Sequence, residues 1–260
     1  MIAFVKLNGD FITSIKVILT MSNIIFKTLH SKEATVEEKE MNQSSKKTKY
    51  LVLVTMFCSI EVLLMFTPLG FIPIGPMKAT TMHIPVILAG ILLGIKGGAI
   101  TGLVFGISSV VNATINPTIL SFVFTPFYSL GEYHGNFMSL VIAIVPRVLL
   151  GVLGGLIYSW FKNRDKNMIG GGVTALLCTV LHTAMVLGMI YIFFGPSYAA
   201  AQGLDTTQLL MALIGLVFTN GLLEACVATV VIVPLVKVLE PMAQKMGLTH
   251  MNIKLNKVER

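Results

Sequence analysis

Charged residues are scarce in this chain. Only 12% of its 260 residues are Asp, Glu, Lys or Arg, whereas 55% are hydrophobic. A soluble domain of this length needs far more charge to cover its surface. The composition therefore excludes an ordinary water-soluble protein, and it predicts a membrane protein whose apolar surface faces lipid.

Cysteine is also rare. The three cysteines, Cys58, Cys178 and Cys226, fall in three separate apolar segments. None has a close partner or a metal-ligand spacing, so we expect small buried hydrophobes, without a disulfide framework and without a bound metal. The motifs GxxxxGK[ST], HExxH and GxSxG are missing as well. We therefore expect no cofactor, no P-loop nucleotide hydrolysis, and no metalloprotease or serine hydrolase activity.

The hydrophobic residues gather in apolar segments, and about 17 to 25 such residues can span a bilayer. The second segment is short, and it spans only if it is tilted or extended by the apolar residues 71–82. The sequence predicts an all-α membrane protein, a bundle of six transmembrane helices. The six segments are residues 50–66, 83–94, 97–113, 139–161, 169–194 and 209–236.

Basic residues lie at the ends of these segments. Lysines precede the first segment, Lys96 lies in the second connection, and further basic residues fill the fourth connection and follow the last segment. Because Lys and Arg are retained on the cytoplasmic side of short loops, both termini are expected in the cytoplasm. The formal net charge of +7 does not indicate nucleic acid, since no basic helix face with interleaved aromatic residues is present.

Residues 1–48 do not fit this scheme, and we expect them to form an N-terminal extension. The early part is apolar but broken by charges, as in an amphipathic helix that lies in the membrane interface. Alternatively the chain starts at Met41, which opens a short basic lead, and we favour this interpretation. Residues 49–239 are expected to form the six-helix transmembrane domain, and residues 240–260 a basic cytoplasmic tail.

Glycine recurs at every fourth position from Gly90 to Gly106. This spacing clears one helix face so that a neighbouring backbone can approach closely, and we interpret it first of all as a packing device. A second group of glycines begins at Gly151. In the first segment Thr55 and Ser59 also stand four apart, and they are a candidate interface for another membrane protein.

Two outer connections are apolar and rich in turn residues. Residues 67–82 contain three prolines and two glycines, which exclude a continuous helix and favour a fixed loop. Residues 114–138 carry a group of aromatic residues that includes Phe127. Apolar irregular segments either pack against the bundle or close over a cavity, so both connections are candidate lids. Phe127, and His83 directly after the first connection, are candidate substrate-binding residues.

A few polar side chains lie deep within apolar segments. A charge at such depth costs about 3 kcal/mol or more unless it is paired or wetted, so Arg147 and Glu224 are candidate functional residues. With about 1.5 Å of rise per residue, Arg147 lies about 12 Å and Glu224 about 20 Å from the outer side. Asn220 stands one turn before Glu224 on the same face, and His182 reaches the middle of the fifth segment.

Two interpretations of these four residues stay open. In the first they converge in a substrate-binding pocket that opens to the outside. Arg147 then meets an anionic or carbonyl group, while Asn220 and His182 form hydrogen bonds. In the second, Arg147 and Glu224 pair as a structural bridge, and Asn220 and His182 tie helices together. A solitary histidine on an apolar face, such as His182, is more often a core residue than a ligand.

Several motifs together resemble a known family. They are TPLGFIPIGPMKATTMHIPVILAGILLGIKGGAITGLVFGISS at residues 67–109, FTPF at 124–127, the dipeptide Pro146-Arg147, and NGLLEA at 220–225. The chain resembles the substrate-binding S components of energy-coupling factor (ECF) vitamin transporters over about residues 49–239. Within that family it is most similar to the pantothenate-type members. Members for folate, hydroxymethylpyrimidine and other vitamins share much of the same pattern.

The resemblance implies six helices with both termini inside, and a vitamin site near the outer face capped by the first and third loops. It also implies docking on a membrane T component coupled to two cytoplasmic ATPases, so the chain itself is a transport subunit of the bacterial plasma membrane and no enzyme. Arg147 suits a carboxylate cargo, because a guanidinium binds a carboxylate bidentately. Family members usually dock through alanines four apart on the first helix, where this chain has Thr55 and Ser59.

Two further functions remain as alternatives. One is an intramembrane enzyme that acts on lipid, with Glu224 and His182 as acid and base. The other is a scaffold whose glycine faces assemble a larger complex, and it predicts a bundle without an internal cavity.

Overall fold

A computed structural model describes residues 43–74, 77–162 and 167–246. The chain divides into two units, Met1–Ser45 and Lys46–Arg260, and the architecture below is that of the second. Residues 1–42 of the expected N-terminal extension, with its alternative start at Met41, lie outside the described residues, whereas residues 43–48 belong to the first described helix. Most of the expected tail also lies outside the described residues.

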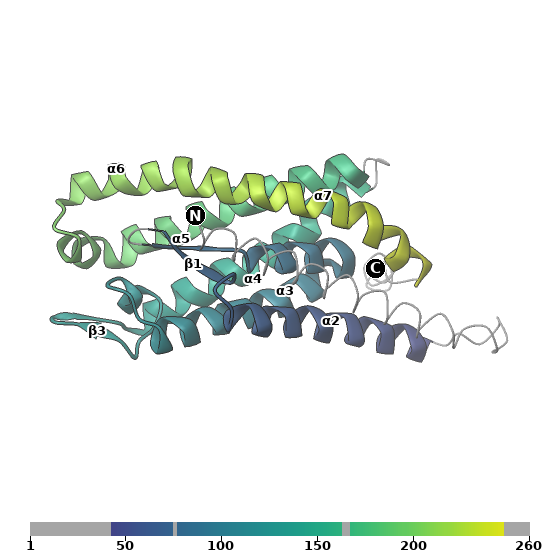
Figure 1. Ribbon diagram of the computed structural model, residues 1–260, viewed down its shortest axis with the longest axis horizontal. Helices are drawn as coiled ribbons and strands as arrows, with labels where there is room; N and C mark the ends of the chain where they lie inside the picture. Colours follow the sequence, from purple (N-terminus) through teal and green to yellow (C-terminus); the bar gives the residue numbers. More distant parts are fainter. Residues whose placement is uncertain (1–42, 75–76, 163–166, 247–260) are drawn as a thin grey trace, which may run out of the picture. The chain divides into compact units, whose positions relative to one another are not determined.

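The second unit is a bundle of long helices (Figure 1). Five helical stretches of the described residues are long and apolar enough to cross a membrane. They follow the predicted apolar segments closely, which confirms the all-α membrane class. The elements are α2 (Gln43–Met65), α3 (His83–Ile115), α4 (Phe137–Lys162), α5 (Asn167–Ala201), α6 (Thr206–Leu216) and α7 (Leu222–Lys245), with the π-helical η2 (Val217–Gly221) between the last two.

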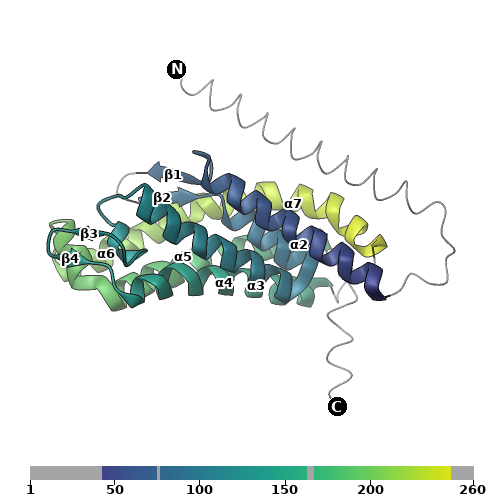
Figure 2. The same cartoon turned by 90° about the horizontal axis from the view of Figure 1, so that it is seen from below.

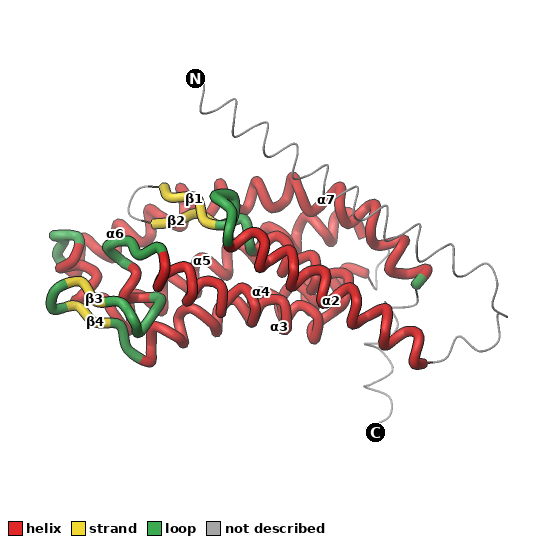
Figure 3. The backbone as a smooth tube through the Cα atoms, turned by 60° about the horizontal axis from the view of Figure 1, so that its bottom comes forward, coloured by secondary structure: helices red, strands yellow, loops and turns green. Residues whose placement is uncertain are grey.

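Short strands occupy both outer connections. In the first, β1 (Phe71–Ile74) and β2 (Met77–Thr80) pair antiparallel, so the expected fixed loop is a β-hairpin. In the second, the 3₁₀ helix η1 (Ser121–Val123) precedes the small hairpin of β3 (Ser129–Leu130) and β4 (Tyr133–His134). Both hairpins lie toward the same end of the bundle, away from the start of α2 and the end of α7 (Figure 3).

Helix α3 reverses direction at Gly94. This residue has φ 74° and ψ −169°, a conformation that is essentially restricted to glycine. A Cβ placed on Gly98 would lie 2.9 Å from the Cα of Gly90, whereas residues eight apart in a straight helix are separated by about 12 Å. The two arms of α3, residues 83–93 and 95–115, therefore lie side by side. They correspond to the second and third predicted segments.

The first arm of α3 is far shorter than the roughly 20 residues of a full crossing. The stretch from α6 to α7, by contrast, is long enough to cross as one unit despite its π-helical interruption. The count of six complete crossings and the cytoplasmic position of both termini stay predictions. α2 runs along the outside of the bundle (Figure 2).

The glycine stripe packs α3 against α4, as expected from its spacing. A Cβ on Gly98 would collide with the carbonyl of Gly151, and a Cβ on Gly106 would lie 2.9 Å from the Cα of Ile144. Real Cβ atoms do not approach backbone so closely, so only glycine permits this contact. The close contact fixes α4, and with it Arg147, against the second arm of α3.

The second outer connection packs into the bundle and also approaches a cavity. Phe122 is fully buried, and its ring meets that of Phe194 edge-on at 5.9 Å. It belongs to a hydrophobic cluster that joins η1 to the end of α5 and to α6. This apolar contact holds the neighbouring residues 118–124 in place beside the polar interior.

Candidate functional site

Arg147 lies in the middle of α4, and only 7% of its surface is exposed. Its Nη1 donates a hydrogen bond of 2.7 Å to the carbonyl of Ile142. In a regular helix that carbonyl would accept from the N–H of residue 146, but Pro146 has no N–H. The sequence Pro-Arg thus frees a backbone acceptor within its own helix and uses it to anchor the guanidinium.

Two aromatic rings flank the same guanidinium. Its central carbon lies 5.5 Å from the ring centre of Phe105 and 5.4 Å from that of Phe124. Both distances are within the range of cation–π attraction. The Nε atom is buried and has no hydrogen-bond partner among the described residues. The charge is therefore held by a carbonyl and two rings, and the Nε–H is left to donate.

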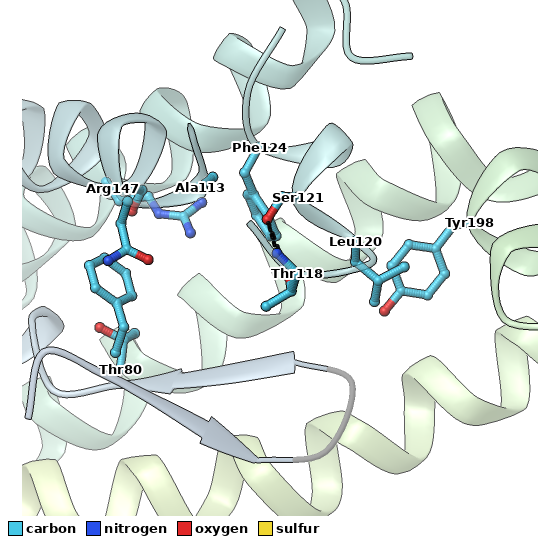
Figure 4. Close-up of a pocket in the computed structure, with 11 residues that line it drawn as sticks. Thr80, Ala113, Thr118, Leu120, Ser121, Phe124, Arg147 and Tyr198 are labelled. Atoms are coloured by element: carbon cyan, nitrogen blue, oxygen red, sulfur yellow. Dashed lines mark hydrogen bonds between the residues drawn. The ribbon is translucent and has the colours of Figure 1, made fainter. Parts of the chain in front are cut away.

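Arg147 faces a first cavity of about 80 Å³ between α3, α4, α5, the β1–β2 hairpin and the segment around η1. In Figure 4 Arg147 and Tyr198 lie at opposite sides of this cavity, with Phe124, Ser121 and Leu120 between them. The lining is mixed polar and apolar, and it contains no acidic side chain. It consists of Phe71, Thr80, Ser109, Asn112, Ala113, Thr118, Leu120, Ser121, Phe124, Arg147 and Tyr198.

A second cavity of about 80 Å³ lies on the side of α5 and α7. Thr80, Phe124 and Arg147 line both cavities, so these three residues stand at their junction. More ionisable side chains line the second cavity than line the first. Its other lining residues are His182, Thr183, Val186, Leu187, Leu216, Asn220 and Glu224.

Glu224 connects α7 to the β1–β2 hairpin. Its Oε1 accepts a hydrogen bond of 2.9 Å from the backbone N–H of Thr80. Thr80 also donates from its hydroxyl to the carbonyl of Gly70, at 2.9 Å. These contacts fix the end of the hairpin over the junction of the cavities. In this geometry Glu224 holds a loop, a role that neither interpretation of the sequence contained.

The π-helical turn η2 sets the positions of Asn220 and Glu224. A π turn inserts an extra residue into a helix and is frequent at functional sites. Gly221 within it packs against Thr183 of α5, whose Cγ2 would lie 3.2 Å from an added Cβ. The contact brings α7 close to the face of α5 that carries His182. His182 is 5% exposed, and its Nε2 has no partner among the described residues.

The structure thus brings together Arg147, His182, Asn220 and Glu224 around the second cavity. It does not bring in the other two candidates. His83 is 2% exposed but is not among the residues that line either cavity. Phe127 is 77% exposed and likewise is absent from both linings. Their assignment as substrate-binding residues has no support from this geometry.

Several lining residues were missed by reasoning from the sequence. Ser109 and Asn112 stand near the end of an otherwise apolar arm of α3, and this local run of polar residues was a usable signal. Phe124 lies in the FTPF motif, beside the candidate Phe127. Thr80 and Tyr198 carry no distinguishing pattern, because a threonine in a loop and a tyrosine near a helix end are both common.

Thr55 and Ser59 lie on an exposed face of α2. Their hydroxyls donate to carbonyls four residues earlier in the same helix, at 2.9 Å to Leu51 and 2.8 Å to Thr55. Both polar groups are therefore satisfied without a neighbour. Elsewhere, no group of three or more His, Cys, Asp or Glu side chains gathers as a metal site within the described part of the chain.

Long apolar helices surround cavities whose lining is mixed polar and apolar. This arrangement defines a multi-pass membrane protein with a cation, Arg147, buried in its interior. Residues 49–236 match the family model described as ECF transporter, substrate-specific component. The chain belongs to this family, as the resemblance of its motifs predicted.

Two named relatives are similar to this chain over more than half of its length. The pantothenic acid transporter PanT of Lactococcus lactis subsp. cremoris is 35% identical over 157 residues, which cover 58% of this chain and 78% of that protein. The pantothenate transporter PanT of Leuconostoc mesenteroides subsp. mesenteroides is 28% identical over 213 residues, which cover 79% of this chain and 98% of that protein. Both relatives are bacterial transport proteins, in keeping with a multi-pass protein of a bacterial membrane.

Proposed function

We propose that this protein binds pantothenate from the outer side of the membrane and delivers it inward as the S component of an ECF transporter. Membership of the substrate-specific component family and the names of the two relatives support this cargo. The observation that carries the proposal is Arg147, a buried cation at the junction of two cavities with an N–H left unpartnered. Pantothenate carries one carboxylate, which is the group that such a cation recognises.

The edge of the guanidinium that carries the Nε–H is available for a carboxylate. Nη1 is engaged by Ile142, so a carboxylate bound side-on takes the Nε–H together with a second N–H of the fork. Phe105 and Phe124 both lie within cation–π distance of the group. A guanidinium held in this way has lost its rotational freedom before the cargo arrives, which lowers the entropic cost of binding.

The size of the cavities and the position of the hairpin bear on how a vitamin fits the site. Each cavity of about 80 Å³ is smaller than the roughly 300 to 1,000 Å³ of a typical ligand pocket. A movement of Phe124 at the junction would enlarge the space for a whole vitamin. The Glu224–Thr80 hydrogen bond then acts as the fixed point from which the hairpin closes over the cargo.

Docking on a T component and coupling to two ATPases are part of the same proposal. α2 is the least buried of the five helices that can cross the membrane. Its face with Thr55 and Ser59 is exposed, and both hydroxyls are internally satisfied. Such a face accepts a close helix neighbour without desolvating unpaired polar groups.

The scaffold alternative predicts an interior without cavities, whereas cavities lie beside Arg147 in the described part of the chain. The enzyme alternative relies on Glu224 and His182, which line the second cavity, but Glu224 already accepts from Thr80. Family membership favours the transport subunit over both alternatives.

The proposal is tested by titrating pantothenate into the purified full-length chain in detergent or nanodiscs, without ATP and without partner subunits. We expect binding of one pantothenate per chain by calorimetry, and an apparent melting temperature that rises with the logarithm of ligand concentration. Folate and hydroxymethylpyrimidine serve as comparison ligands. Stronger binding of either, with none of pantothenate, would contradict the proposed cargo.

A further inference from the structure

Two buried hydroxyl groups in the first cavity lack hydrogen-bond partners. The Oγ of Ser109 and the phenolic oxygen of Tyr198 have none among the described residues. Ser109 is 5% exposed and Tyr198 is 2% exposed. An unsatisfied buried polar group costs about 1 to 3 kcal/mol, so a ligand that hydrogen-bonds with both would recover that cost on binding.

The other hydroxyl groups near η1 are already engaged. Ser121 accepts from the backbone N–H of Thr118 at 2.8 Å, and the two side-chain oxygens lie 3.3 Å apart. Figure 4 shows this pair between Arg147 and Tyr198. Three buried atoms without a partner among the described residues therefore belong to residues that line the first cavity: the Oγ of Ser109, the phenolic oxygen of Tyr198 and the Nε of Arg147.

The hydroxyls of Ser109 and Tyr198 suit an uncharged polar group of the cargo. A hydroxyl both donates and accepts, so it matches a hydroxyl or an amide of the cargo. No acidic side chain lines the first cavity, whereas Glu224 lines the second and would repel a carboxylate placed beside it. The anionic end of a cargo is therefore best placed at Arg147 with the remainder of the molecule in the first cavity.

We infer that Ser109 and Tyr198 determine specificity by binding uncharged polar groups of the cargo. Tyr198 lies across the cavity from Arg147 (Figure 4), so it binds a hydroxyl at the end remote from the carboxylate. Ser109 stands one helical turn after Phe105, which contacts the guanidinium, so it binds a polar group nearer to the carboxylate. The cargo class is a carboxylic acid with a hydroxyl at its opposite end. This inference rests on the proposed function, and pantothenate is a molecule of this class.

The test combines two conservative variants with two cargo analogues. The variants are Tyr198→Phe and Ser109→Ala, each of which removes one hydroxyl. Pantothenol replaces the carboxylate by a hydroxymethyl group, and 4-deoxypantothenate lacks the hydroxyl at the remote end. The dissociation constant of each analogue and of pantothenate is measured by calorimetry on the full chain.

We expect Tyr198→Phe to weaken pantothenate and pantothenol alike, by about tenfold, since one hydrogen bond is lost. It leaves the affinity for 4-deoxypantothenate unchanged, because that analogue never made the bond. Ser109→Ala weakens pantothenate and pantothenol by about fivefold. The matched controls are Tyr191→Phe on α5 and Ser108→Ala on α3, which are not among the cavity-lining residues and leave all three affinities unchanged.

The binding results distinguish failure of the inference from failure of the proposed function. If Tyr198→Phe weakens 4-deoxypantothenate as much as the parent compound, or if both variants bind pantothenate like wild type, the inference is wrong while the proposed function stands. If the wild-type chain binds no pantothenate, the proposed function and the inference fall together. Melting temperatures of the cargo-free variants check that the hydroxyl deletions leave the fold intact.

Discussion

At the scale of single residues, the dipeptide Pro146-Arg147 shows how a charge is kept inside a membrane helix. The proline removes one backbone donor, and the arginine takes the acceptor that is left. The same proline that weakens α4 locally therefore orients the guanidinium. This relation follows from helix geometry alone, but the sequence could not show that the side chain turns back toward Ile142 rather than toward Glu224.

The first prediction is that Pro146→Ala weakens the affinity for pantothenate by about three- to tenfold. The new N–H restores the regular helical bond to the Ile142 carbonyl and competes with Nη1 of Arg147. The apparent melting temperature of the cargo-free chain should rise at the same time, because an interior proline is removed from the helix.

Calorimetry and thermal unfolding of the same preparation measure both effects. Pro234→Ala in α7 is the matched control, since Pro234 is also inside a helix but is not a cavity-lining residue. An unchanged affinity in Pro146→Ala would show that the freed carbonyl does not matter for the cargo.

The second prediction separates the two roles considered for Glu224. Glu224→Gln keeps a side-chain oxygen that accepts from the N–H of Thr80, so the affinity for pantothenate should stay within about threefold of wild type. Glu224→Leu removes the acceptor, leaves that N–H unpaired and should weaken binding by about tenfold. The dissociation constants of pantothenate for the two variants, measured by calorimetry, decide between the two roles. Equal loss in both variants would instead favour a charge pair with Arg147.

At the scale of elements, the close contact between α3 and α4 depends on glycine. We predict that Gly98→Ala lowers the free energy of unfolding by about 2 to 4 kcal/mol, because its Cβ collides with the Gly151 carbonyl and the helices must move apart. Thermal or denaturant unfolding in a fixed detergent measures the change. Gly188→Ala on α5 is the control, since nothing lies within 4 Å of its added Cβ. Equal stability of the two variants would contradict the packing account.

Much of the element order follows from hydropathy, and so does the reversal near Gly94. Apolar segments and the lysine between the second and third of them located both arms of α3. The β1–β2 hairpin and the π turn η2 could not be predicted in the same way. The hairpin contains prolines that argue against strands, and its position depends on Glu224 from a helix 144 residues away. A π turn leaves no reliable mark in the sequence.

The cavity lining was predictable where a polar residue stood in an apolar helix. Arg147, His182, Asn220 and Glu224 were chosen for this reason, because a polar group at such depth is costly without a purpose, and all four line the second cavity. Ser109 and Tyr198, which line the first cavity, were not among the candidates, because a place in the lining depends on which helices meet there. His83 and Phe127 were chosen from their place beside the loops, which says little about the direction in which a side chain points.

At the scale of the whole molecule, binding and delivery should be separable. We predict that Thr55→Leu together with Ser59→Leu abolishes pantothenate uptake by cells, because two bulky side chains fill the face of α2 that we propose as the docking surface. Cargo binding by the purified variant should stay unchanged, since neither residue lines a cavity. Uptake of labelled pantothenate and co-purification of partner subunits are the measurements.

Ser159→Leu on α4 is the matched control for this variant. Ser159 is an exposed helical serine whose hydroxyl is satisfied by its own helix, at 2.7 Å from the Leu156 carbonyl. It should support normal uptake. Normal uptake by the double α2 variant would show that another face carries the docking.

The account as a whole depends on a carboxylate bound by Arg147, and one measurement tests this most directly. The dissociation constants of pantothenate and pantothenol are measured for wild type and for Arg147→Gln by calorimetry. We predict that the variant loses on the order of 100-fold in affinity for pantothenate, since a buried charge partner is removed, and less than about threefold for pantothenol, which has no carboxylate. An equal loss for both ligands, or no loss for pantothenate, would contradict the account.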